Sequence, residues 1–274
     1  MTLKPERSAA RLRHHYEVEK ALAARLKATR TPAERAAIYA TMYQELFREV
    51  PDHPRLTMRR DPAAEQLQVA RLLQLLAPCL HSETEYVEFG AGTGALAFAV
   101  APRVRHVRVV EIADQLPADT TRPGNFELVL YDGSNLDLPA ASADVVFSEQ
   151  FLEHLHPDDA RHHLRLVHRL LRPGGRYVLR TPERWTGPHD ISRAFAATPQ
   201  GFHLREWTYH ELAGEARAIG FGAVRCWWNA RGARVAVPLP VFAALEHLMP
   251  AWPRVLRHTL GHRLIPMVTM ALEK

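Results

Sequence analysis

From about residue 85 onward, the chain alternates short apolar runs with longer segments in which apolar residues recur every three or four positions. The runs have the length of buried strands, and a spacing of three to four is typical of amphipathic helices. The predicted strands are residues 85–89, 106–112, 126–131, 143–148, 176–181, 221–228 and 267–272. Helices are predicted near residues 95–100, 160–171 and 208–219. This alternation predicts an α/β fold, with a mainly parallel sheet and helices on both faces.

The first 80 residues contain no strand-like run and are predicted to be helical. Thr31 and Glu34 form a capping box around Pro32, a residue that suits the first turn of a helix. The helix that they open carries an apolar stripe, formed by Tyr39, Met42, Tyr43, Leu46, Phe47 and Val50. Asp61, directly before Pro62, marks the start of another helix.

We therefore divide the chain into an N-terminal helical extension, residues 1–80, and a main α/β domain, residues 81–274. Residues 230–264 separate the last two predicted strands by more than a hairpin needs, and they contain two short amphipathic segments. This stretch is predicted to be an insertion over one edge of the sheet.

The segment Glu88-Phe-Gly-Ala-Gly-Thr-Gly94 joins the first predicted strand to a helix. Its glycines permit positive φ and let a ligand lie against the backbone, and the helix that follows directs free N–H groups toward that ligand. The second strand ends at Glu111, about 20 residues further on, where an acid can accept both hydroxyls of a ribose. This arrangement predicts a nucleoside-binding site.

Two details disfavour a nicotinamide-dependent reductase. The dinucleotide fingerprint is G-x-G-x-x-G, whereas the third glycine of this chain comes one residue early. Glu88 precedes the first glycine by two residues, and its charge would repel a pyrophosphate but suits a cationic ligand. The resulting E-x-G-x-G-x-G pattern resembles the first motif of class I S-adenosylmethionine-dependent methyltransferases.

The resemblance to this family extends over roughly residues 60–274. It includes Asp132-Gly133 after the third strand, Leu136-Asp-Leu-Pro139 before Ala143-Asp-Val-Val-Phe147, and Arg172-Pro-Gly-Gly175 before the fifth strand. It implies a Rossmann-like, seven-stranded methyltransferase sheet and S-adenosyl-L-methionine as cofactor. It also implies that the N-terminal helical extension forms a lid, whereas the residues alone equally allow it to pack on the domain without touching a substrate. In this family the acid at Asp132 accepts from the adenine amino group, and the next N–H meets the ring. As residues alone, Asp-Gly is equally a simple turn.

The cofactor-binding residues implied by the resemblance lie at the carboxyl ends of the first four strands. They are Glu88, Gly90, Ala91, Gly92, Gly94, Glu111, Ile112, Asp132, Gly133, Ser148 and Glu149. Ser148 and Glu149 are expected beside the methionine end of the cofactor.

Methyl transfer from a sulfonium depends mainly on alignment, and an oxygen acceptor must also lose a proton to a nearby base. The predicted catalytic residues are His154, after the fourth strand, and His189 with Asp190, after the fifth. His154 could instead bond a neighbouring loop, and adjacent side chains such as 189 and 190 need not face each other. His203 is a further candidate for the acceptor site. No typical metal-ligand spacing is present, so no metal is predicted.

Composition narrows the class of partner. The net charge of +5 favours an anionic partner, RNA included. The positive charge is spread over arginines along the helices, however, without a basic tract interleaved with aromatics, so nucleic-acid binding is not the main expectation.

Cys79 and Cys226 are predicted to be free thiols. No signal core and no apolar run of the ~20 residues that span a bilayer is evident, and we expect a cytoplasmic protein.

These observations together predict methyl transfer from S-adenosyl-L-methionine to a small-molecule acceptor, with oxygen preferred as nucleophile. Many nucleic-acid N-methyltransferases have an Asp/Asn-Pro-Pro-aromatic motif after the fourth strand, where this chain has Ser148-Glu-Gln-Phe151. Two alternatives stay open: a catalytically silent, methyltransferase-like binding protein, and an RNA methyltransferase. The acceptor, the methylated atom and the oligomeric state are left open by the sequence.

Overall fold

The computed structural model describes residues 7–57, 61–114, 116, 121–131, 136–230, 233–265 and 267–274. Its centre is a sheet with the strand order β3-β2-β1-β4-β5-β8-β6-β7. The strands are β1 (Glu85–Phe89), β2 (His106–Glu111), β3 (Phe126–Leu130), β4 (Ala143–Glu149), β5 (Leu171–Pro182), β6 (Ala223–Ala230), β7 (Ala233–Ala236) and β8 (Met267–Glu273). The first five are parallel to one another, whereas β8 pairs antiparallel with β5 and β6, and β7 antiparallel with β6.

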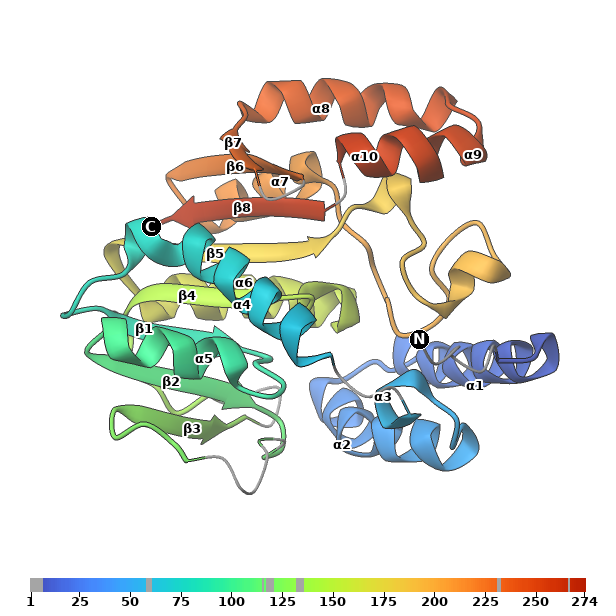
Figure 1. Ribbon diagram of the computed structural model, residues 1–274, viewed down its shortest axis with the longest axis horizontal. Helices are drawn as coiled ribbons and strands as arrows, with labels where there is room; N and C mark the ends of the chain where they lie inside the picture. Colours follow the sequence, from blue (N-terminus) through green and yellow to red (C-terminus); the bar gives the residue numbers. More distant parts are fainter. Residues whose placement is uncertain are drawn as a thin grey trace.

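Helices cover both faces of this sheet, as the alternating pattern predicts (Figure 1). They are α1 (Ala9–Lys27), α2 (Pro32–Glu49), α3 (Pro54–Thr57), α4 (Pro62–Leu76), α5 (Ala95–Val100), α6 (Pro157–Leu170), α7 (Tyr209–Ile219), α8 (Leu239–Leu248), α9 (Arg254–Leu256) and α10 (His262–Leu264). The predicted capping box at Thr31 is formed, a second capping box is present at Thr208, and Asp61 caps α4. None of the helices in the described ranges is both long and apolar enough to cross a membrane.

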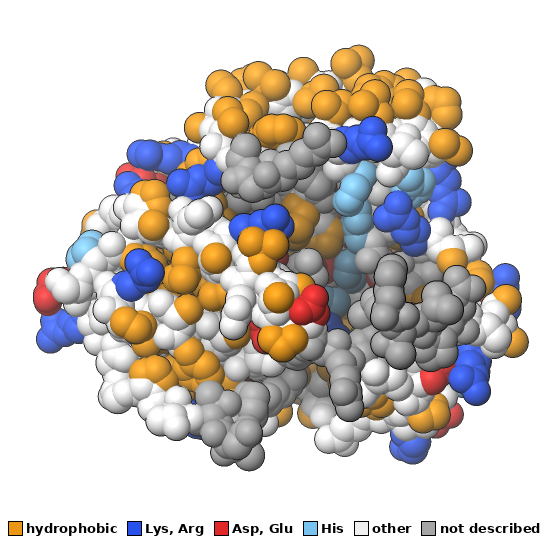
Figure 2. Space-filling view, viewed as in Figure 1, with side chains coloured by type: hydrophobic (Ala, Val, Ile, Leu, Met, Phe, Trp, Pro, Cys, Tyr) orange, Lys and Arg blue, Asp and Glu red, His pale blue; other side chains and the backbone are white. Residues whose placement is uncertain are grey.

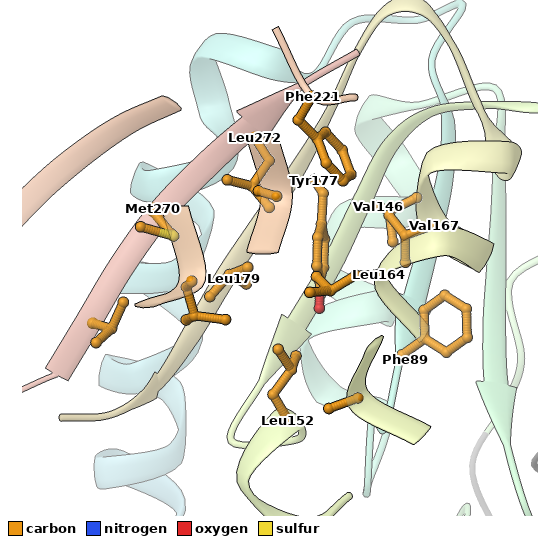
Figure 3. Packing of buried hydrophobic residues seen from close by; sticks show 14 of the residues in the cluster. Phe89, Val146, Leu152, Leu164, Val167, Tyr177, Leu179, Phe221, Met270 and Leu272 are labelled. Atoms are coloured by element: carbon orange, nitrogen blue, oxygen red, sulfur yellow. The ribbon is translucent and has the colours of Figure 1, made fainter. Parts of the chain in front are cut away.

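The strands are apolar on both faces because each face is covered. In β4, Val145 and Phe147 pack with α4 and α5, whereas Val146 packs with α6 on the opposite side. Figure 3 shows this second core, in which Leu164 and Val167 of α6 lie against Val146 and Tyr177 of the sheet. A continuous apolar run is therefore what a doubly covered parallel strand requires.

The N-terminal helices α1 and α2 lie beside the carboxyl ends of the parallel strands (Figure 1). The predicted stripe on α2 is confirmed as core, since Met42, Leu46 and Val50 are buried with Phe202 and Leu204 of the distant loop before α7. A buried ion pair between Arg35 of α2 and Asp159 of α6, with an N–O distance of 2.6 Å, adds a polar tie. The extension is thereby joined to the side of the sheet where ligand sites of open α/β folds lie.

The structure departs from the expected seven strands because it contains an eighth, β7. The segment that was expected to be only an insertion first pairs with β6 as a strand, with Trp228 opposite Val235, and only then forms helices. One of these, α8, packs on α7 through a stacked pair of rings, Phe242 on Tyr209. The Arg172-to-Gly175 passage also lies inside β5 rather than before it, where a break in register accommodates Gly174 at φ 78°.

Candidate functional site

The glycine loop between β1 and α5 has the backbone that the sequence predicts. Gly90, Gly92 and Gly94 have φ values of 71°, 58° and 74°, in the left-handed region that disfavours side chains. A Cβ on Gly90 would lie 2.8 Å from the Phe151 ring, whereas a Cβ on Gly92 would meet nothing within 4 Å. The first glycine is therefore required by packing, and the second, next to Ala91, faces open space in which a ligand can lie.

Glu111 lies at the end of β2, directly beside this loop. Its Oε1 accepts a hydrogen bond of 2.9 Å from the Gly92 backbone N–H. Burial raises the pKa of Glu111, and the loop N–H groups oppose that rise by stabilising the carboxylate. The next residue, Ile112, has a side chain that is 44% exposed, which is unusual for a large apolar group at a strand end. An acid and an apolar side chain are thus presented together beside the glycine loop.

A second carboxylate, Glu88, lies beneath the loop in β1 and is only 4% exposed. It accepts a hydrogen bond from the Tyr86 hydroxyl at 2.9 Å. Burial raises the pKa of Glu88 to about 8, and the nearby carboxylates of Glu111 and Glu149 act in the same direction. Glu149, at the end of β4, is paired with the Arg180 guanidinium at 2.9 Å. Within the described ranges, Glu88 and Glu111 therefore have no basic side-chain partner, whereas Glu149 has one.

Ser148 has a different environment from the one expected. Its side chain is fully buried, and its hydroxyl lies 2.7 Å from the Tyr177 hydroxyl, which in turn lies 3.0 Å from Nε2 of His163. This chain of polar groups lies under α6, within the core rather than at the sheet edge. Only the main chain of Ser148 is thus available to a ligand. Asp132 and Gly133, the expected adenine contacts, lie outside the described residues.

The predicted catalytic residue His154 ends a short 3-10 turn, Leu152–His154, that follows β4. Its Nδ1 lies 3.0 Å from the Phe202 carbonyl oxygen, and its ring meets that of His203 edge-on, with centroids 5.1 Å apart. Burial lowers the pKa of His154 to about 3, so the ring is neutral near pH 7. His154 thus bonds a neighbouring loop through Nδ1, and this bond does not involve Nε2.

His154 has two neighbours that sequence reasoning did not bring together with it. Glu153 is fully buried and accepts a hydrogen bond from the Thr181 hydroxyl at 3.0 Å. Nδ1 of His203 lies 2.9 Å from the Glu206 carboxylate. A carboxylate oxygen of Glu153 and one ring nitrogen of each histidine all lie within 4.8 Å of one another. Figure 2 shows histidine side chains gathered in a hollow between the upper and lower halves of the molecule.

His189 and Asp190 are not paired with each other in the structure. Nε2 of His189 lies 3.0 Å from the Glu183 carbonyl oxygen, inside its own loop. The Asp190 carboxylate accepts hydrogen bonds from the backbone N–H groups of Ser192, at 2.9 Å, and Gly201, at 3.0 Å. Asp190 thus holds the loop that carries His203 in place and does not orient His189.

Glu19 of α1 is a buried carboxylate beside the loop of Phe202 that the sequence did not reveal. Its carboxylate lies 2.7 Å from Nε2 of His15 and accepts from the Phe202 backbone N–H at 3.2 Å. A third side chain, His53, lies 3.8 Å from the same carboxylate. The i, i+4 spacing of His15 and Glu19 on one helix face could have suggested a pair. Its contact with Phe202 could not, because the two residues are far apart in the chain.

Comparison with known proteins agrees with this geometry. Residues 87–179 match the family model for a methyltransferase domain. A probable S-adenosylmethionine-dependent methyltransferase of Mycolicibacterium smegmatis is 32% identical over 145 residues, which cover 50% of this chain and 51% of the relative. The chain thus spans about half the length of this curated relative.

Solved structures show the same fold at low identity. The 1,6-didemethyltoxoflavin-N1-methyltransferase of Burkholderia thailandensis, solved with 1,6-didemethyltoxoflavin and S-adenosylhomocysteine, superposes with a TM-score of 0.54 at 21% identity, covering 90% of this chain and 91% of its own. An S-adenosylmethionine-dependent methyltransferase of Archaeoglobus fulgidus gives 0.52 at 18% identity, covering 76% and 94%. With its glycine loop, its acid at the end of β2 and this sheet order, the chain has the fold of these S-adenosylmethionine-dependent methyltransferases, and its residues 87–179 match the methyltransferase-domain model.

Proposed function

We propose that this protein transfers a methyl group from S-adenosyl-L-methionine to a small-molecule acceptor with an oxygen nucleophile. The observation that carries the proposal is the placement of the Glu111 carboxylate 2.9 Å from the N–H of Gly92, at the open part of the glycine loop. A carboxylate there can accept the ribose hydroxyls, while the loop leaves room for the amino-acid part of the cofactor.

Other residues are assigned to the cofactor by their position around this loop. Gly90, Ala91 and Gly94 shape the turn, and Ile112 offers an exposed apolar surface beside the ribose acid. Glu88 and Glu149 lie below the loop, and the ionised carboxylate of Glu88 would stabilise a sulfonium cation there. Asp132 and Gly133 keep their proposed adenine role, with Ser148 contributing through its backbone.

The acceptor is proposed to enter between the carboxyl ends of β4 and β5 and the N-terminal helices, which act as a lid. Among the proposed catalytic residues, His154 is assigned the role of base because it follows β4, whose carboxyl end borders the proposed acceptor path. The Phe202 carbonyl oxygen can only accept a hydrogen bond, so Nδ1 of His154 donates it. The neutral His154 ring then carries its lone pair on Nε2. That nitrogen can take a proton from a hydroxyl. His189 and Asp190 are assigned to shaping the acceptor loop.

The test is transfer of label from S-adenosylmethionine with a labelled methyl group to separated pools of small metabolites, RNA and protein. The proposal predicts label in the small-molecule fraction. Nuclease-sensitive label in RNA would overturn it in favour of the alternative that the charge of +5 suggests. Retained cofactor binding without label in any pool would indicate a silent binding protein.

A further inference from the structure

Two buried groups of two histidines and one glutamate lie near the carboxyl edge of the sheet. One is Glu153 with His154 and His203, here called the cleft triad. The other is His15 with Glu19 and His53, here called the lid triad. In each, one possible ligand atom per residue lies within 4.8 Å of the other two. Distance alone therefore does not tell which triad could bind a metal ion. The hydrogen bonds made by each histidine ring distinguish the two.

In the lid triad the outer ring nitrogens accept hydrogen bonds. The Arg7 guanidinium, which only donates, lies 2.8 Å from Nδ1 of His15, and the Arg55 backbone N–H donates to Nδ1 of His53 at 3.1 Å. Each Nε2 then carries the proton and faces Glu19 as a donor. Two N–H groups around a carboxylate form a closed polar cluster in which neither imidazole turns a lone pair toward Glu19.

In the cleft triad the outer ring nitrogens donate instead. Nδ1 of His154 is bonded to the Phe202 carbonyl oxygen, and Nδ1 of His203 to the Glu206 carboxylate. Both partners are acceptors, so the lone pair of each neutral ring is on Nε2. Histidines that ligate metals almost always donate their second nitrogen to a carbonyl or carboxylate in this way, which fixes the tautomer and the orientation of the ring.

The third member adds a separate observation. Oε2 of Glu153 accepts from Thr181, whereas Oε1 is buried with no donor in hydrogen-bonding distance within the part of the chain that the structure describes. A buried carboxylate oxygen without a partner is costly, and a cation would satisfy it. Carboxylates that ligate metals are usually hydrogen-bonded themselves, as Glu153 is to Thr181.

We propose that Glu153, His154 and His203 form a three-ligand site for a divalent transition-metal ion, with its remaining coordination positions toward the acceptor cleft. Two imidazoles and a carboxylate suit Zn²⁺ with an open fourth position, or Fe²⁺ with more. Ligand atoms around such an ion lie roughly 3–4 Å apart, which small side-chain rotations from the present arrangement provide. Binding displaces any proton on either Nε2.

A metal ion at this site could activate the acceptor hydroxyl in place of the His154 ring. This role of the ion rests on the proposed function. A hydroxyl oxygen bound to the ion would lose its proton to water more easily. The resulting oxygen anion would form a bond to the methyl carbon as the S–C bond of S-adenosylmethionine breaks and S-adenosylhomocysteine leaves. In the metal-bound enzyme His154 is then a ligand, and the ion takes over the activation that the free ring would otherwise provide.

The test uses untagged full-length protein that has been stripped with a chelator and titrated calorimetrically with Zn²⁺, Fe²⁺ under anaerobic conditions, and Mg²⁺. One equivalent of Zn²⁺ or Fe²⁺ is expected, with weaker Mg²⁺ binding. His154→Gln and His203→Gln should each weaken binding at least tenfold. Glu206→Gln, which removes the charge from the acceptor on Nδ1 of His203, should weaken it about tenfold. The matched control is His53→Gln in the lid triad, which should retain wild-type affinity.

Because a buried histidine variant can fail to fold, each is checked by circular dichroism, and Co²⁺ absorption of the wild type reports ligation independently of any variant. Absence of a bound equivalent in the wild type, or equal loss in His53→Gln, would overturn the site. Titration of the same samples with S-adenosylmethionine separates the two proposals. Cofactor binding without metal binding refutes the site alone, and metal binding without cofactor binding refutes the proposed function alone.

Discussion

The Glu111 carboxylate accepts a hydrogen bond of 2.9 Å from the backbone N–H of Gly92. This contact joins the end of β2 to the middle of the glycine loop and holds a buried acid at the surface where a ribose would lie. A carboxylate has about four lone-pair sites, so it can retain this bond and still accept from sugar hydroxyls. The loop and the acid therefore form one prearranged unit.

Replacing Glu111 by Ala should weaken binding of S-adenosylhomocysteine by roughly 1–3 kcal/mol, because charge-assisted bonds to the ribose are lost. The measurement is calorimetric titration of the variant against the wild type. Glu83→Ala is the control, since its side chain is 73% exposed in a weak surface pair with Arg105. Equal affinities for Glu111→Ala and the wild type would refute the ribose assignment.

Two glycines of the loop should respond differently to alanine. Gly90→Ala places a methyl group 2.8 Å from the Phe151 ring at a left-handed residue, so it should lower the melting temperature by several degrees. Gly92→Ala meets open space, so only the cost of positive φ, about 1 kcal/mol, falls on stability. Its methyl group would project into the ligand space, and cofactor affinity should fall more than stability does. Thermal melts with cofactor titrations check this difference, and an opposite ranking would contradict it.

The ionisation of Glu88 predicts a pH-dependent preference for the cationic cofactor. Burial raises the pKa of this carboxyl group to about 8, so a large fraction is neutral at pH 7. A sulfonium binds better to the ionised form, and the ratio of S-adenosylmethionine to S-adenosylhomocysteine affinity should rise roughly threefold to tenfold from pH 7 to pH 9. Glu88→Gln should make that ratio independent of pH. A flat wild-type profile would show that Glu88 does not sense the sulfonium.

Glu19 predicts how acid loosens the N-terminal helices. Burial opposes its ionisation, but His15 and His53 outweigh burial and lower the pKa to about 2. A lowered carboxyl pKa stabilises the folded state above the unfolded value near 4.5, and this contribution is lost as the pH falls toward 2. Glu19→Gln should therefore cost roughly 3 kcal/mol at pH 7 and progressively less below pH 4. Urea unfolding of the variant and the wild type at pH 7 and below pH 4 measures this cost. A loss of unfolding free energy that grows on acidification would contradict a lowered pKa for Glu19.

Local patterns predicted much of the fold. The capping boxes at Thr31 and Thr208 and the apolar strand runs depend on neighbours in sequence, and all are present in the structure. The short strand β7 was missed because Ala233–Ala236 gains its identity from pairing with β6 and has little intrinsic strand signal.

The candidate site, too, contains contacts that a local motif predicts and contacts that depend on tertiary packing. Glu111 beside Gly92 follows from a motif of fixed spacing within one strand-helix-strand unit. The contact of His154 with Phe202 and the approach of His203 depend on how the loop after β5 packs back onto the turn after β4. Such contacts between distant segments are set by tertiary packing, and the sequence alone did not join Glu153 to the two histidines or Glu19 to Phe202.

The central claim, a preformed S-adenosylmethionine site, is tested most directly by calorimetric titration of the wild-type protein with S-adenosylmethionine and S-adenosylhomocysteine, with NADH as control. The account predicts one site per chain with micromolar affinity for the first two and no detectable heat with NADH. Binding of NADH in preference to both, or no binding of either adenosyl ligand, would contradict it.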